Sequence, residues 1–231
     1  MKKIVWFLLL LLVVPLGVSA TTFDLNDTDM SIEFDEDIWY VFTPDNIKDN
    51  AELDELGISY EYMVETFQTN EAYLDAVLFY QDSEDYIEIF VRKTKLDDIQ
   101  NLMNYDDDFI NELGNALAEE RNANYKIYQK DYPFIKLDYI DQGFYLNEYY
   151  TIVNGDAYTI TAQKPYSFNE EDELRVQEII DSVEFDVDTS LKEPSSISWS
   201  TIFKYAMIGA LVGALITYLV KLINKKEKNE G

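Results

Sequence analysis

The sequence contains no cysteine and no histidine among its 231 residues, and it has only eight glycines. Without cysteine there is no disulfide, no thiolate nucleophile and no lipid-modified cysteine anchor. Without histidine the chain lacks the commonest general base and the commonest zinc ligand. It also has no phosphate-binding glycine loop and no G-x-S-x-G nucleophile motif. No residue stands out as catalytic or cofactor-binding, so the sequence predicts a protein that is not an enzyme.

Basic residues are also scarce, since 18 lysines and arginines stand against 45 aspartates and glutamates. Residues 21–200 carry 43 of the acidic and 11 of the basic residues, which gives this part a net charge of −32. Nucleic-acid binding requires a basic surface and is excluded on this ground. Docking onto anionic lipid is disfavoured for the same reason. An acidic surface of this kind suits solubility, cations or a basic partner.

The first 20 residues have the pattern of a secretory signal peptide. Lys2 and Lys3 precede an apolar stretch, and small residues at positions 18–20 suit signal peptidase. We therefore expect cleavage between Ala20 and Thr21. The alternative is an uncleaved anchor, although the apolar run before Pro15 is short for a helix that needs about 20 residues to span. In either case the residues that follow are expected to be exported.

A second apolar segment, residues 201–223, is long enough to cross a membrane as a helix. From residue 202 to residue 223 such a helix measures roughly 33 Å, against a hydrocarbon core of about 30 Å. Lysines are concentrated in the tail, residues 224–231, which the positive-inside rule places in the cytoplasm. The sequence thus predicts a single-pass cell-membrane protein whose main domain, residues 21–188, lies outside on a stalk, residues 189–200.

Two glycines in the apolar segment, Gly209 and Gly213, are spaced as in motifs that let spanning helices approach closely. Small residues are also common in spans that stand alone. We expect these glycines to mark a helix-packing surface, and the partner helix is either a second copy or another membrane protein.

Hydrophobic periodicity predicts an α+β domain with a mostly antiparallel sheet, helices packed on both of its faces, and one C-terminal transmembrane helix. An apolar side that includes Leu174 is expected for the last helix of the domain. Strands 30–34 and 38–42 are expected to form a hairpin, and Asn154-Gly155 predicts another. The other predicted elements are helices at 46–56 and 59–69, strands at 73–80 and 86–93, a broken helical region at 96–121, strands at 125–130, 134–139, 144–153 and 157–163, and a helix at 167–182.

Three stretches, residues 32–39, 149–161 and 176–185, resemble the Mog1/PsbP-like superfamily, and most closely its uncharacterised membrane-anchored bacterial members. The resemblance implies an antiparallel sheet packed between helices. It also implies a non-catalytic binding or accessory role. No functional motif of that group maps onto individual residues of this chain.

An acidic stretch, residues 24–29, has oxygen-bearing side chains on alternating positions, as calcium loops do. It departs from the EF-hand pattern, because Asp29 stands where the glycine belongs and Asp35 replaces the final glutamate. We expect an unordered lead-in to the domain here and assign no metal site. The predicted function is accordingly a membrane-anchored exported accessory or binding module, and the alternative is a calcium- or ligand-binding surface protein that acts alone.

Overall fold

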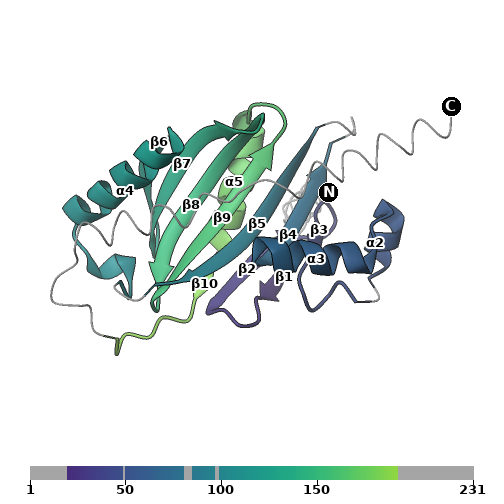
Figure 1. Cartoon of the computed structure of the whole chain (residues 1–231), viewed down its shortest axis with the longest axis horizontal. Coiled ribbons are helices and arrows are strands. Elements are labelled where there is room, and N and C mark those ends of the chain that lie inside the picture. Colours follow the sequence, from purple (N-terminus) through teal and green to yellow (C-terminus); the bar gives the residue numbers. More distant parts are fainter. Residues whose placement is uncertain (1–19, 49, 81–84, 97–98, 192–231) are drawn as a thin grey trace, which may run out of the picture.

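The computed structural model describes residues 20–48, 50–80, 85–96 and 99–191 (Figure 1). These residues form an α+β domain with two antiparallel sheets. The larger sheet has seven strands in the order β3-β4-β5-β9-β8-β7-β6, and the smaller has three in the order β1-β2-β10. The strands are β1 (Ala20–Asp24), β2 (Met30–Asp35), β3 (Tyr40–Phe42), β4 (Ala72–Phe79), β5 (Tyr86–Lys95), β6 (Asn124–Gln129), β7 (Pro133–Asp141), β8 (Phe144–Val153), β9 (Asp156–Lys164) and β10 (Glu184–Phe185). The helices are α2 (Ala51–Leu56), α3 (Tyr60–Asn70), the 3₁₀ turn η1 (Leu102–Asn104), α4 (Asp107–Arg121) and α5 (Glu170–Ser182).

The run β6 to β9 is an antiparallel meander whose turns follow from local sequence. Asn154 and Gly155 have φ values of 53° and 80°, as the predicted two-residue turn between β8 and β9 requires. Gln142 and Gly143 turn the chain between β7 and β8 with φ values of 49° and 91°. The hairpin predicted at Asn154-Gly155 is confirmed, as is the order of four consecutive strands.

Helices α4 and α5 begin at side chains that cap their free backbone N–H groups. The Asp106 carboxylate accepts from the N–H of Phe109 at 2.9 Å, and two further acids in the first turn suit the helix dipole. Asn169 and Asp172 form a reciprocal capping box at the start of α5. Both helices were expected from apolar periodicity, and the caps explain where each of them begins.

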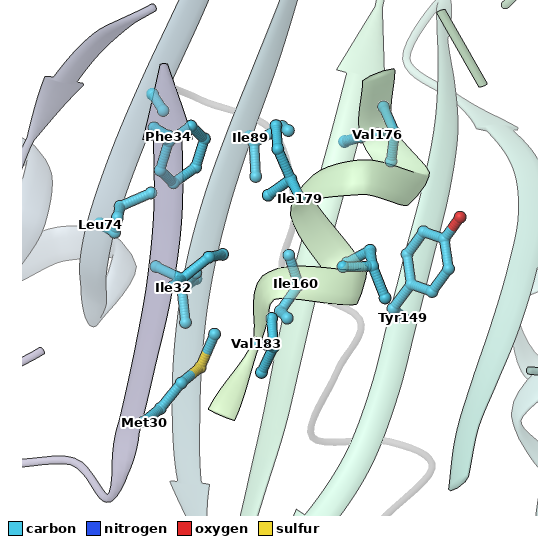
Figure 2. Packing of buried hydrophobic residues seen from close by; sticks show 14 of the residues in the cluster. Met30, Ile32, Phe34, Leu74, Ile89, Tyr149, Ile160, Val176, Ile179 and Val183 are labelled. Atoms are coloured by element: carbon cyan, nitrogen blue, oxygen red, sulfur yellow. The ribbon is translucent and has the colours of Figure 1, made fainter. Parts of the chain in front are cut away.

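The two faces of the seven-stranded sheet are covered by different elements. Neighbouring residues of β8 separate them, because Tyr149 packs in the cluster that contains α5 and Tyr150 packs in the cluster that contains α4. Helix α3 belongs to the α4 side, where Phe67 packs with Phe42 of β3. Strand β2 shares the α5 side, and Figure 2 shows its side chains beside those of the α5 region and the sheet: Met30, Ile32, Phe34, Val176, Ile179, Val183, Leu74, Ile89, Ile160 and Tyr149.

The predicted hairpin of strands 30–34 and 38–42 is wrong. Both edges of β2 are occupied, by β1 on one side and by β10 on the other. Strand β3 pairs instead with β4, with Tyr40 opposite Val77. The Asp35 carbonyl oxygen accepts from the N–H groups of Ile38 and Trp39, and this tight turn passes the chain from one sheet to the other.

Three smaller expectations also differ from the structure. The stretch 24–29 is not an unordered lead-in, because residues 20–24 form β1 and the Leu25 and Met30 backbones hydrogen-bond across the turn. Leu174 is 62% exposed and does not belong to the apolar side of α5. The first short helix was expected to begin at residue 46. It begins at Ala51, and Asn50 caps it.

The predicted signal segment before Ala20, most of the stalk and the predicted transmembrane segment lie outside the described residues. Among the residues that are described, no helix is both long and apolar enough to cross a membrane.

Gly114 of α4 lies against the ring of Tyr125 on β6. A Cβ at position 114 would stand 2.6 Å from two ring carbons of Tyr125. We expect Gly114→Val to lower the free energy of unfolding by about 1–3 kcal/mol, because the ring must be displaced in a packed region. Asn115→Ala, at an exposed position of the same helix, is the control and should be neutral or slightly stabilising. Chemical denaturation of the two variants measures the difference, and equal stability would contradict the packing described here.

Candidate binding groove and buried carboxyl cluster

A hollow of about 650 Å³ lies at the β3 edge of the seven-stranded sheet. We call it the β3–β4 groove, and its lining residues are Glu36, Asp37, Ile38, Trp39, Tyr40, Leu78, Phe79, Tyr80 and Arg175. Its volume is within the range of about 300–1,000 Å³ typical of ligand pockets. In Figure 1 the edge with β3 and β4 lies at the opposite end of the sheet from β6 and α4.

The groove exists because β3 is shorter than its neighbour. Strand β3 begins at Tyr40, opposite Val77, whereas β4 continues to Phe79. The turn before β3 is anchored by Trp39, which is 3% exposed and packs edge-on against Phe34 at 5.6 Å between ring centroids. The next residue back, Ile38, is 42% exposed. One side of the turn is therefore fixed in the core while the other side faces the groove.

Aromatic rings form much of the groove wall. The rings of Tyr40 and Phe79 pack edge-to-face at 6.0 Å, and Tyr86 continues the row at 6.3 Å from Phe79. Tyr80 donates its hydroxyl hydrogen bond to the Asp172 carboxylate. Burial and the negative charge of Asp172 together raise the pKa of Tyr80 well above its usual value. Tyr80 is therefore fixed as a neutral donor at one end of the groove.

Two exposed carboxylates, Glu36 and Asp37, lie at the rim of the groove. Glu52 of α2 is outside the groove lining, and burial together with the charges of Glu36 and Glu55 raises its pKa. Arg175 also lines the groove, and its guanidinium Nη2 lies 2.6 Å from the Glu171 carboxylate. Because Arg175 already has this counter-ion, the rim keeps a surplus of negative charge.

A second polar feature lies inside the sheet, on the α4 side, and sequence reasoning missed it. Asp75 of β4 and Glu88 of β5 are 1% and 0% exposed. Gln163 donates to Glu88 at 2.8 Å. Burial raises the pKa of Asp75 to about 7, and burial together with the nearby Asp75 raises that of Glu88 well above its usual value. Each carboxyl therefore holds its proton more strongly in the folded protein than in the unfolded chain.

A buried ion pair lies on the same side of the sheet, between the sheet and α4. The Arg121 Nε at the end of α4 is 3.1 Å from Glu148 of β8, and the two side chains are 3% and 0% exposed. The contact has the distance of an ion pair without the alignment of a good hydrogen bond. The Tyr139 hydroxyl donates to the other carboxylate oxygen of Glu148 at 2.9 Å. The pair ties α4 to the centre of the sheet.

The buried carboxyls are placed to support the fold rather than to meet a substrate. General acid–base chemistry requires the group to reach the proton that it transfers. Asp75, Glu88 and Glu148 are almost wholly enclosed, so a molecule from solvent cannot contact them. A signal for them was present in the sequence, since each is an acid within a strand that is apolar on both of its faces.

Two buried lysines hold the start of α5 on the other face of the sheet. Lys164 Nζ lies 2.6 Å from Asp172, and it is also 4.7 Å from the centre of the Tyr80 ring. Lys136 Nζ lies 2.7 Å from Glu173. Both acids have lowered pKa values because their lysine and other hydrogen bonds outweigh burial. These pairs position the helix, which in turn carries Arg175 to the groove.

The acidic stretch 24–29 borders a separate hollow of about 450 Å³. Its oxygens are partly engaged, because Asp29 accepts from Asn154 at 2.9 Å and the Asp27 carbonyl accepts from Lys93. Across the described residues, no group of three or more acidic, histidine or cysteine side chains is arranged to hold a metal ion.

Of the residues singled out from sequence, Ala20 and Thr21 are the first residues of β1, where Thr21 lies opposite Phe34 of β2. Cleavage between Ala20 and Thr21 stays a prediction. Gly209 and Gly213 lie outside the described residues, and their role in helix packing also stays a prediction.

The groove was not foreseen, because its residues come from positions 36–40, 78–80 and 175 and meet only in the fold. No protein-family model matches this chain, and no curated protein matches it in sequence.

Proposed function

We propose that this protein is a membrane-anchored, exported accessory or binding module that does not act as an enzyme. Residues 1–20 export it, residues 201–223 anchor it as one transmembrane helix, and the short tail is cytoplasmic. The Mog1/PsbP-like resemblance belongs to the same proposal. The observation that carries the binding role is the β3–β4 groove, where aromatic walls meet an acidic rim at a sheet edge.

The groove suits binding better than catalysis for a physical reason. Aromatic side chains give large contact area at little entropic cost and are enriched where proteins recognise partners. Two polar side chains of the groove are engaged within the fold, because Tyr80 donates to Asp172 and Arg175 pairs with Glu171. The groove thus offers a surface for contact and no activated nucleophile.

Gentle detergent extraction of the full chain from its native membrane tests this proposal. We expect a second protein to co-purify in fixed proportion, as measured by size determination and mass spectrometry. Replacing Gly209 and Gly213 together by leucine should weaken association that depends on the membrane helix. A chain that is recovered alone, as a monomer, would contradict the accessory role.

A further inference from the structure

The β3–β4 groove combines an apolar surface with an acidic rim, and this pairing limits what can occupy it. Ile38 is 42% exposed, and Tyr40 and Phe79 are half-buried beside it. An exposed aliphatic side chain next to aromatic rings favours an occupant with apolar groups of its own. The rings also attract cations to their faces.

The charges beside the groove select the sign of the occupant. Glu36 and Asp37 are exposed at its rim. Arg175 is engaged by Glu171 at 2.6 Å. An anionic occupant would be repelled, whereas a cationic occupant would neutralise the surplus negative charge of the rim.

We propose that the β3–β4 groove binds a basic segment of a partner protein, with a lysine or arginine stem on Ile38 and the aromatic rings and its charge at Glu36 and Asp37. This inference rests on the proposed function, because it names the partner chemistry of the same groove. A mixed basic and apolar segment fits both halves of the groove, since lysine and arginine carry an apolar stem and a charged end.

The protein already uses this mode of contact within its own fold, next to the groove. Lys164 lies over the ring of Tyr80 at 4.7 Å while its ammonium group pairs with the Asp172 carboxylate at 2.6 Å. A cation on an aromatic face with a carboxylate at its charged end is thus compatible with this local structure. At the groove the ring of Tyr40 and the carboxylates of Glu36 and Asp37 offer the same kinds of group toward solvent.

The test measures binding of short synthetic peptides to the full chain held in detergent or a nanodisc, by fluorescence anisotropy. The probe alternates lysine and leucine, and two comparison peptides alternate glutamate with leucine and lysine with serine. We expect the lysine–leucine peptide to bind at least about tenfold more tightly than either comparison peptide, because only it matches both charge and apolar surface. Binding of the lysine–serine peptide with equal affinity would overturn the proposal.

Matched variants then locate the binding. Glu36→Gln with Asp37→Asn should weaken lysine–leucine binding about fivefold, as expected for two partly exposed ion pairs. Glu119→Gln with Glu120→Gln removes the same charge from exposed positions of α4, near the other sheet edge, and should leave the affinity nearly unchanged. Equal losses in the two double variants would show non-specific attraction to an acidic protein and would refute the groove as the site.

Ile38→Ser tests the apolar half, with Leu174→Ser as its exposed control on α5. We expect about a tenfold loss for the first variant and none for the second. The inference and the proposed function can fail separately. A co-purified partner that stays bound to Ile38→Ser and to the rim variant would leave the function standing and reject the groove. If the peptide binds the groove but no partner protein co-purifies with the chain, the groove stands as a binding site and the accessory role is rejected.

Discussion

Replacing Glu88 by glutamine is expected to reduce the pH dependence of stability between about pH 5 and 8. The folded chain raises the pKa of Asp75 to about 7 and that of Glu88 well above its usual value. The folded state therefore holds protons that the unfolded chain releases near pH 4. Stability from this pair is fully present below the unfolded values and is lost as pH rises through the folded ones.

The expected size of this effect is large for a single site. A raised pKa changes stability by about 1.4 kcal/mol per unit of pH over the interval between the unfolded and folded values, so we expect a loss of about 2–4 kcal/mol between pH 5 and 8. In Glu88→Gln the amide can still accept from Gln163, and the proton held by Glu88 is absent. Asp75 stays buried and keeps its raised pKa, so only the part of the pH dependence that belongs to Glu88 is lost. Glu119→Gln, at an exposed site, is the control for the general repulsion among acids. If the stability of wild type and Glu88→Gln changed equally with pH, the raised pKa of Glu88 would be contradicted.

Glu148→Ala is expected to destabilise the fold by about 3–5 kcal/mol, because Arg121 would keep a buried charge without its carboxylate. The two side chains are 0% and 3% exposed and stand 3.1 Å apart. The double variant Glu148→Leu with Arg121→Met should regain much of the loss, since both charges leave the interior together. Urea denaturation measures all three proteins.

An exposed ion pair provides the matched control. Glu171 and Arg175 lie 2.6 Å apart on the first turns of α5, but their side chains are 70% and 30% exposed. Glu171→Ala should change stability by no more than about 0.5 kcal/mol, because water and salt screen such pairs. If Glu148→Ala cost no more than Glu171→Ala, the buried pair would not have the structural role described here.

Local sequence predicted those parts of the fold that local chemistry determines. The turn at Asn154-Gly155 requires positive φ at both positions, and few residues other than these adopt it easily. The start of α4 at Asp106 and the run β6 to β9 follow from a cap and from alternation in the same way. Each of these features depends on residues that are close together in the chain.

The features that the sequence did not reveal depend on distant residues. Strand β2 alternates as a hairpin strand would, but its partners are β1 and β10, and β10 lies about 150 residues away. In the sequence, Asp75 and Glu88 look like solvent-facing residues of a strand. Their burial becomes evident only in the fold, because the sheet is covered on both faces. The groove likewise joins a turn near residue 37 to the end of β4 and to α5.

The most direct test of a partner at the groove is site-specific photo-cross-linking in the native membrane. A photoreactive residue at position 38 of the full chain should give one discrete cross-linked product, and peptides of its second component should be rich in lysine or arginine. The same residue at position 174, which is 62% exposed on α5, should give none. The absence of a product at position 38, or the same product at both positions, would contradict the view that this protein works by binding a partner at the β3–β4 groove.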